Sequence, residues 1–457
     1  MLIRFVVENV FSFGERKEFN MLPYKRLKTL KKHLYKRSDI DILKMASLYG
    51  ANGAGKSNLI KAFSLFQKLI LKEDIPLPLK DSHFKLDSKK RNEDQLFAIE
   101  FIQDATPYYY ALMLSNDIIK KEELYQSGLG KTDDELIYER ETDEDGNSSI
   151  NFFDEFGKSE KNQLLKSLLL EEFVQPNEPI LKLLSNRENK ALNTIKIAYK
   201  WFEDTLQIIT PDSKPRALAH WIDMDKEFKR YAIDLMCSFN LGISSLSTDK
   251  KEINKFFGED DSDAVDLFTK KIEESPRNML EFGVGGKDIV IVKEDDDIFV
   301  KEIQVGHQGI QDNNVMFDLD DESDGTIRLL DFVPAFKEVI SKRKVFIVDE
   351  FERSIHPLLI KELVSKFSLD EDTQGQLVFT THESNLLDQE LFRQDEIWFV
   401  EKDNTGSSDL YSLSEFSEHK SIDIRKGYLS GRYGSIPFMG NLEDLNWHKY
   451  DTDKQAI

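Results

Sequence analysis

The stretch that decides the fold is SLYGANGAGKSNLIKAF, residues 47–63. Its centre, Gly50 to Ser57, matches the phosphate-binding pattern G-x-x-x-x-G-K-[ST]. The apolar run ILKMASLYG leads into it, and apolar residues recur at helical spacing after Lys56. Strand, glycine-rich turn and helix therefore follow one another as a phosphate-binding loop requires. The pattern alone leaves a transporter motor, a repair ATPase, a GTPase switch and a kinase open.

The loop predicts specific roles for its residues. Backbone N–H groups from Gly50 to Lys56 wrap a phosphate only where glycines accept unusual backbone angles. The start of the following helix adds a partial positive charge. We expect Lys56 to reach the β- and γ-phosphates and the Ser57 hydroxyl to ligate Mg²⁺, so ATP and Mg²⁺ are the predicted cofactors.

A second site is predicted in KVFIVDEFERSIHP, residues 344–357. Four apolar residues precede Asp349 and Glu350, which places both carboxylates at the carboxyl end of a buried strand. Asp349 fits a Walker-B group that holds Mg²⁺, and Glu350 fits a general base for hydrolysis. The alternative is an ordinary solvated strand end, and the P-loop makes the functional interpretation the stronger one.

Two further segments carry candidate nucleotide-contacting residues, one at the expected end of a strand and one at the expected start of a helix. QLVFTTHESN predicts a strand that ends at Thr380, with His382 placed to sense a γ-phosphate, although a lone histidine is more often structural. DESDGTIRLLDFVPAF predicts a helix capped by Ser323, whose N-terminus forms a second anion site. One chain that binds one triphosphate needs only one such site, whereas two chains facing head to tail need both.

The order of elements predicts an α/β protein. Helices and strands are expected to alternate in the final third of the chain, which indicates a parallel sheet covered on both faces. The expected order is helix 326–341, strand KVFIVDE, helix PLLIKELVSKF, strand QLVFTTH, helix SNLLDQELF and strand EIWFVEK. Pro334 predicts a kink or a short helix. Residues from about 158 to 278 look mainly helical, and we expect a helical insertion there.

These motifs together resemble the ABC-type AAA ATPase head of the SMC, RecF and OLD branch. GANGAGKSN resembles its Walker A, including Asn52 and Asn58; ESDGT stands in place of the transporter signature; FTTHESNLLD resembles the switch histidine; and FVVENVFSFGE resembles the first strand. GYLSGRYGSIPFMG also resembles the phage-defence ATPase subunits RloA/AbiL and PARIS AriA. The Q-loop glutamine stays unassigned between Gln67 and Gln95.

The resemblance implies a P-loop NTPase head with a mixed sheet and flanking helices. Its expected parts are an N-terminal lobe (1–115), a β-rich extension (116–157), a mainly helical insertion (158–285), a C-terminal lobe (286–440) and a tail (441–457). It implies three sets of site residues: nucleotide-binding Gly50, Asn52, Gly53, Gly55, Lys56, Ser57 and Asn58; catalytic Lys56, Glu350 and His382; and signature residues Ser323, Asp324, Gly325 and Thr326 acting in trans.

The resemblance further implies a function. We expect an ATP-sandwich homodimer that senses a phage-protein trigger and controls a separate toxin or nuclease subunit, with a Toprim-type nuclease suspected. The chain after residue 402 is too short for a Toprim domain of its own. The alternative is a DNA-binding ATPase of the RecF or SMC kind that acts in DNA repair or maintenance.

Composition limits the partners. The formal net charge of −22 repels nucleic acid from the protein as a whole, although residues 25–37 carry seven Lys and Arg. A solvated loop is the more ordinary interpretation of that basic run, so DNA is possible but not favoured. One cysteine, Cys237, and the absence of a signal sequence or membrane-spanning run indicate a cytoplasmic protein without a membrane partner.

Overall fold

The computed structural model describes most of the chain. The described residues are all except 38, 72–78, 116–117, 154–155, 157, 259–261, 276–277, 285–286, 312, 417, 420 and 437–457. The expected tail, 441–457, therefore lies outside the described residues, as do the last four residues of GYLSGRYGSIPFMG.

A six-stranded sheet forms the centre of the molecule, in the order β11-β17-β18-β5-β19-β20. Its first five strands are parallel, and β20 is antiparallel. Because parallel strands share a direction, their carboxyl ends meet at one edge. The strands are β11 (Leu206–Ile209), β17 (Val345–Val348), β18 (Gln376–Thr380), β5 (Met45–Tyr49), β19 (Ile397–Lys402) and β20 (Ser408–Ser412).

Both faces of the central sheet are covered, which explains why its strands are continuous apolar runs. Ala46 and Leu48 of β5 pack with helix α1 (Lys56–Leu71) in one hydrophobic cluster. Met45 and Tyr49 point to the other face, where the cluster includes residues of α10 (Asp324–Ser341) and α11 (Pro357–Leu369). Helix α12 (Ile424–Leu429) adds to that second cluster. The predicted α/β class is confirmed.

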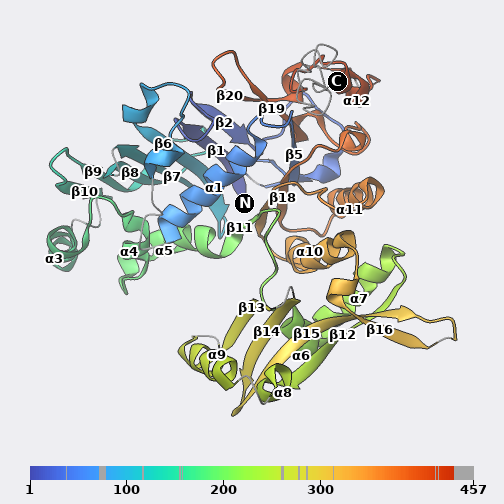
Figure 1. Cartoon of the computed structure of the whole chain (residues 1–457). Coiled ribbons are helices and arrows are strands. Elements are labelled where there is room, and N and C mark those ends of the chain that lie inside the picture. The colour runs from blue at the N-terminus through green and yellow to red at the C-terminus, as the bar shows by residue number, and fades with distance from the viewer. Residues whose placement is uncertain are drawn as a thin grey trace, which may run out of the picture.

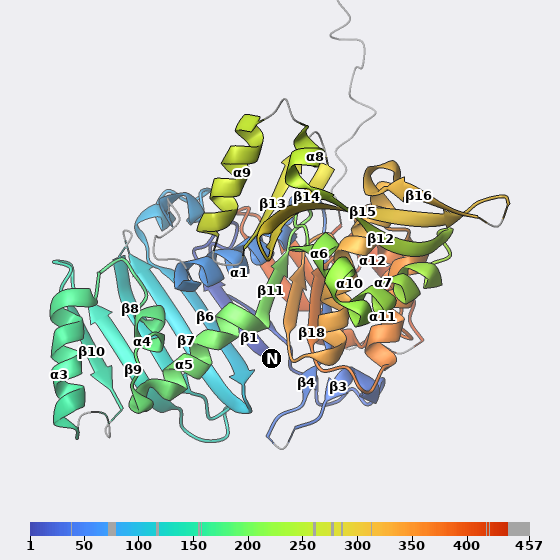
Figure 2. The ribbon, with the colours of Figure 1, turned by 90° about the horizontal axis from the view of Figure 1, so that it is seen from below.

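A seven-stranded antiparallel sheet packs on the far side of α1 (Figures 1 and 2). Phe63 and Phe66 of α1 stack on Phe5 and Phe97 of this sheet, with ring centroids 3.8 and 5.4 Å apart. The sheet order is β10-β9-β8-β7-β6-β1-β2. The strands are β1 (Leu2–Glu8), β2 (Lys17–Asn20), β6 (Gln95–Gln103), β7 (Thr106–Ser115), β8 (Ile118–Gln126), β9 (Glu135–Thr142) and β10 (Ser148–Phe152).

The helices between residues 160 and 200 lie against this antiparallel sheet. Buried Glu122 of β8 accepts hydrogen bonds from the backbone N–H groups of Ile180 and Leu181, which begin α4. The carboxylate also accepts from the hydroxyls of Tyr110 and Tyr138. These contacts fix the start of α4 on the sheet. The helices are α3 (Glu160–Leu168), α4 (Ile180–Ser185) and α5 (Asn193–Lys200).

The elements between residues 218 and 318 form a separate antiparallel sheet with its own helices, seen at the bottom of Figure 1. Strand order is β12-β15-β14-β13, and β16 pairs with β15. The strands are β12 (Ile243–Glu252), β13 (Met279–Val284), β14 (Lys287–Glu294), β15 (Asp297–Gln308) and β16 (Asn314–Asp318). The helices are α6 (Leu218–Met224), α7 (Lys226–Ser238), α8 (Ile253–Phe257) and α9 (Ser262–Glu274).

The structure adds strands to the segment expected as a mainly helical insertion. Residues 206–209, expected within it, form β11 and pair in parallel with β17 of the central sheet. Residues 243–252 form β12 rather than a helix, and residues 287–318, expected in the C-terminal lobe, extend the same separate sheet. The polar strand β12 carries no strong pattern of its own, and its pairing with β15 decides its conformation.

Two local predictions also fail. SNLLDQELF forms only a 3-10 turn, Ser384–Leu386, because carboxylates of Glu383 and Asp388 accept from the nearby backbone N–H groups of Asn385 and Glu390 instead. Of the two alternatives expected at Pro334, a kink or a short helix, the short helix is wrong, because helix α10 continues past Pro334 to Ser341. Its buried apolar face, including Leu330 and Val333, packs into the second cluster and offsets the lost hydrogen bond.

Candidate functional site

The P-loop connects β5 to α1, and two of its glycines stand where no side chain fits. A Cβ on Gly50 would lie 2.3 Å from the backbone oxygen of Val400. Gly55 has a φ of +119°, and a Cβ there would lie within contact of the Ser408 hydroxyl. Gly53 also has a positive φ, of +77°, but open space surrounds it. The spacing of the first and last glycines is therefore imposed by packing against β19 and β20.

Lys56 opens α1 and points back into the loop. Its Nζ donates to the backbone oxygens of Gly50, at 2.8 Å, and Ala51, at 3.3 Å. Burial lowers the pKa of Lys56 to about 8, and the carboxylates of Glu352, Asp349 and Glu350 partly oppose that shift. A buried ammonium whose short contacts are to backbone carbonyl groups is well placed to exchange them for phosphate oxygens.

Ser57 and Asp349 meet at the carboxyl edge of the sheet. The Ser57 Oγ donates to Oδ1 of Asp349 at 3.1 Å, and the Thr380 hydroxyl donates to the same oxygen at 2.6 Å. A hydroxyl oxygen and a buried carboxylate oxygen side by side are the protein ligands that Mg²⁺ has in P-loop sites. Among the described residues no group of three or more His, Cys, Asp or Glu side chains could hold a metal. The two oxygens therefore fit a Mg²⁺ completed by phosphate and water.

Glu350 follows Asp349 with a strained backbone. Its φ is +49°, a region that non-glycine residues rarely adopt, and its N–H donates to the Thr380 hydroxyl at 2.8 Å. Strain of this kind persists only where neighbouring contacts hold it. The half-exposed carboxylate of Glu350 lies close enough to Lys56 for its charge to raise the pKa of that lysine, against the effect of burial.

His382 lies on the next strand end, against Lys56. Its Nδ1 is 3.5 Å from Lys56 Nζ, and because an ammonium only donates, Nδ1 is the acceptor and Nε2 carries the proton. Burial, and then the charge of Lys56, hold the pKa of His382 below its usual value. The imidazole is therefore neutral near pH 7 and keeps one N–H donor.

Sequence reasoning missed two residues that organise this edge. Thr380 was expected only as a strand end, yet its hydroxyl links Asp349 to Glu350. Glu352 accepts from the backbone N–H of His382 at 2.6 Å, and its Oε2 is buried without a partner among the described residues. The sequence offered one signal for the role of Thr380: it is a polar residue at the end of an apolar strand next to the Walker-B strand.

The Ser323–Thr326 segment begins α10 as predicted. The Ser323 hydroxyl accepts from the Thr326 N–H at 3.2 Å, while Ser323 itself is exposed. A Cβ on Gly325 would lie 2.5 Å from the backbone oxygen of Ser354, so the segment packs on the loop after Glu350. Within the described part of the chain, no hydrogen bond joins this segment to the P-loop of the same chain.

The loop that leaves β11 contacts both of these elements. Buried Arg328 of α10 donates to the backbone oxygens of Ser213 and Thr210, each at 3.2 Å. Arg353, in the loop after Glu350, pairs with Asp212 at 3.3 Å. The entry to the separate β-sheet module is therefore fastened to the signature helix and to the loop that follows Walker B.

The remaining predicted loop residues differ in their surroundings. Asn52 is exposed at the tip of the P-loop, and Asn58 is half-buried in the first turn of α1. Both candidate Q-loop amides are used elsewhere: Gln67 donates to Phe202 and Leu206 oxygens, and Gln95 donates to Asn9 and Ser82. The structure brings neither glutamine into a contact with the site residues.

A cavity of about 580 Å³ adjoins the P-loop. It is lined by residues 51–54, by Glu401 and Lys402 at the end of β19, and by Gly431, Gly434, Ser435 and Ile436. The Ser435 N–H donates to Glu401 at 2.9 Å, which fixes the C-terminal segment beside the loop. The motif GYLSGRYGSIPFMG thus reaches the mouth of the phosphate loop, a placement that its sequence alone did not give.

A family model described as "AAA domain, putative AbiEii toxin, Type IV TA system" matches residues 45–388. This range runs from β5 through the P-loop, the Ser323 segment and Walker B to just beyond His382. The chain belongs to this AAA family. In this AAA protein, strand β5 before the P-loop and strands β17 and β18 from the later part of the chain lie in one central sheet. No curated protein sequence is similar enough to count as a relative.

Among solved structures, the AAA protein is similar to heads of SMC proteins. One is an SMC head bound to the C-winged helix domain of ScpA (12% identity, TM-score 0.40, 91% of this chain and 99% of that chain covered). Another is the SMC head domain from Thermotoga maritima (13%, 0.39, 90% and 98%). A third is an Smc head with an extended coiled coil bound to the C-terminal domain of ScpA derived from Pyrococcus furiosus (11%, 0.39, 94% and 98%). At these values the assignment rests on the family model.

None of the helices that the structure describes is both long and apolar enough to cross a bilayer.

Proposed function

We propose that this AAA protein hydrolyses ATP as a dimerising switch that controls a separate toxin or nuclease subunit in anti-phage defence. The observation that carries the proposal is the convergence of Lys56, Ser57 and Asp349 at one edge of the central sheet. The family description, which names a toxin and a toxin–antitoxin system, supports the defence context.

The residues of the site divide the work in the following way. Lys56 would bind the β- and γ-phosphates in place of its carbonyl partners, and Ser57 with Asp349 would hold Mg²⁺, which would supply charge neutralisation. Glu350 takes the proton of the attacking water. The neutral His382 donates its Nε2–H to a γ-phosphate oxygen. The second anion site, at Ser323 and Gly325, serves the nucleotide of a partner copy.

The dimer follows from an incomplete site. Ser323 and Asp324 of the signature segment are exposed, and among the described residues no hydrogen bond joins this segment to the P-loop of the same copy. A head-to-tail pair would place each signature on the other copy's nucleotide. Two copies, each of which completes the other's site, then close on ATP and open after hydrolysis.

The loop after β11 supports transmission of that closure. Arg328 and Arg353 tie it to the signature helix and to the loop after Walker B. Because the separate β-sheet module follows this loop in the chain, movement at the nucleotide would reach the module directly. We propose that this module binds the effector subunit, and that the effector is a Toprim-type nuclease.

The switch is tested with Glu350→Gln. Light scattering with ATP should show a stable dimer for Glu350→Gln, whereas Lys56→Ala should remain unchanged by ATP. Normal hydrolysis by Glu350→Gln would remove Glu350 from the role of base. The defence role is tested separately by plaque counts in cells that carry the gene with its neighbours. Equal plaque counts with wild type and Lys56→Ala would reject defence while leaving the ATPase intact.

A DNA-binding ATPase of the RecF or SMC kind is the second candidate, and the basic run at residues 25–37 favours it. The net charge of −22 opposes it. A DNA titration at low and moderate salt separates the two candidates. Binding that falls steeply with salt, together with DNA-stimulated hydrolysis, would favour the second candidate, and no binding at low salt would reject it.

A further inference from the structure

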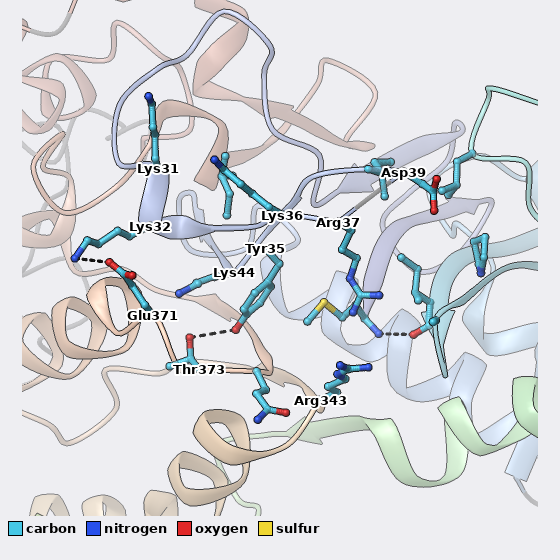
Figure 3. Close-up of a pocket in the computed structure, with 18 residues that line it drawn as sticks. Lys31, Lys32, Tyr35, Lys36, Arg37, Asp39, Lys44, Arg343, Glu371 and Thr373 are labelled. Atoms are coloured by element: carbon cyan, nitrogen blue, oxygen red, sulfur yellow. Dashed lines mark hydrogen bonds and ion pairs between the residues drawn. The ribbon is translucent and has the colours of Figure 1, made fainter.

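A large cationic cavity lies away from the P-loop (Figure 3). Its volume is about 800 Å³. Two carboxylate side chains, Asp39 and Glu371, are among its described lining residues. Six cationic side chains line it: Lys31, Lys32, Lys36, Arg37, Lys44 and Arg343. Part of the basic run therefore gathers around one hollow instead of spreading over a convex loop.

Most of this positive charge is not neutralised by the protein. Lys32 pairs with Glu371 at 2.6 Å, but Lys44 donates only to the backbone oxygen of Asp370. Within the described residues neither Arg37 nor Arg343 forms an ion pair with a carboxylate. Burial, and then the nearby charge of Arg343, lower the pKa of Arg37. Arg37 is half-buried, so its unpaired charge costs free energy in the empty site, and a bound anion would relieve that cost. Arg343 is exposed and adds a second guanidinium at the same cavity.

The cavity is built into the framework of the central sheet. Lys44 directly precedes β5, Arg343 precedes β17, and Thr373 with Gln374 precedes β18. The Tyr35 hydroxyl donates to Gly375 at 2.6 Å, and its ring lies beneath Lys44 at 5.2 Å. Because these strands are parallel, the cavity lies at their amino ends, at the edge opposite to the P-loop. It is therefore separate from the nucleotide site.

We propose that this cavity binds a small, multiply charged phosphorylated ligand, at a site separate from both the P-loop and the Ser323 segment. Guanidinium groups match phosphate oxygens in pairs, and lysines add point charges around them. The concave shape suits a compact molecule. A long duplex would also meet the repulsion of the remaining protein surface, whereas a small ligand inside the cavity feels mainly its six cations.

The test measures binding of inorganic tripolyphosphate by calorimetry. Every protein carries Lys56→Ala, which removes the main phosphate-binding side chain of the P-loop and makes the result independent of ATP hydrolysis. The test variant adds Arg37→Gln and Arg343→Gln. The matched control adds Arg26→Gln and Lys28→Gln, which remove the same charge from exposed positions outside the cavity.

The expected result is a loss of affinity of about tenfold or more in the test variant and little change in the control. Thermal unfolding of both variants at similar temperatures excludes misfolding as the cause. Equal affinities in the two variants, or no binding to the Lys56→Ala parent, would overturn the proposal. It is also overturned if duplex DNA binds the parent more tightly than tripolyphosphate does and the same two arginines account for that binding, because the ligand class would then be nucleic acid.

Discussion

The Thr380 hydroxyl lies 2.6 Å from Oδ1 of Asp349 and holds that carboxylate at the end of the Walker-B strand. The Thr380 hydroxyl oxygen also accepts a hydrogen bond from the backbone N–H of Glu350 at 2.8 Å, and the φ of Glu350 is positive. One side chain of β18 thus positions both the carboxylate proposed for Mg²⁺ and the carboxylate proposed as base.

Replacing Thr380 by Val removes both hydrogen bonds at nearly constant volume. We expect kcat for ATP hydrolysis to fall about 10–100-fold, as is usual when a partner of a metal-binding carboxylate is lost. Thr380→Ser keeps the hydroxyl and should stay within a few-fold of wild type. Steady-state phosphate release measures both variants. Wild-type rates in Thr380→Val would show that the hydroxyl does not position the site.

The two glycines Gly50 and Gly53 should respond differently to alanine. In Gly50→Ala the new Cβ meets the Val400 backbone oxygen, and the shift this requires should cost more than about 2 kcal/mol of loop stability. In Gly53→Ala the new Cβ enters open space, so the only cost in loop stability is that of a positive φ, about 1 kcal/mol.

The measurement for this pair is the Kd of a fluorescent ATP analogue. Gly50→Ala should bind it at least about tenfold more weakly than Gly53→Ala does. Equal Kd values would mean that the loop adjusts to a side chain at position 50.

Two arginines that fasten the loop after β11 should differ in their contribution to stability. Arg328 is 6% exposed and donates to two backbone oxygens, so Arg328→Met should lower the free energy of unfolding by about 2 kcal/mol. Arg353 and Asp212 are solvent-exposed, and Arg353→Gln should cost less than about 1 kcal/mol. Urea unfolding followed by tryptophan fluorescence compares them, and equal losses would contradict the burial argument.

The sequence was sufficient where the chemistry depends on adjacent residues. The P-loop, the strand that ends at Asp349 and the Ser323 cap are local patterns, and each lies where its motif predicted. Strands β11 and β12 were missed because their neighbours decide them: LQII is too short to stand out, and ISSLSTDKKE is polar. Long-range pairing with β17 and β15 supplies what their own residues lack.

The same reason explains the missed parts of the sites. Thr380 reaches Asp349 only because β17 and β18 are neighbours, and Arg343 meets Arg37 only because the strand ends converge. Neither contact leaves a periodic signal in the chain. The basic run at residues 25–37 was visible, but its gathering around a cavity required Lys44 and Arg343, which lie outside it.

The central claim is that each ATP site is completed by a second copy of the chain. Two variants test it: Lys56→Ala, which lacks a working P-loop, and Ser323→Arg, which blocks the signature. Each should be inactive alone. An equal mixture forms mixed dimers in which one site combines the intact P-loop of one copy with the intact signature of the other.

The deciding measurement is ATP hydrolysis by that mixture. Because half of the dimers are mixed and each of these holds one complete site, activity should return to about a quarter of the wild-type rate. If the mixture stays as inactive as its components, the signature does not act across a dimer interface, and the account of the protein as a dimerising switch is wrong.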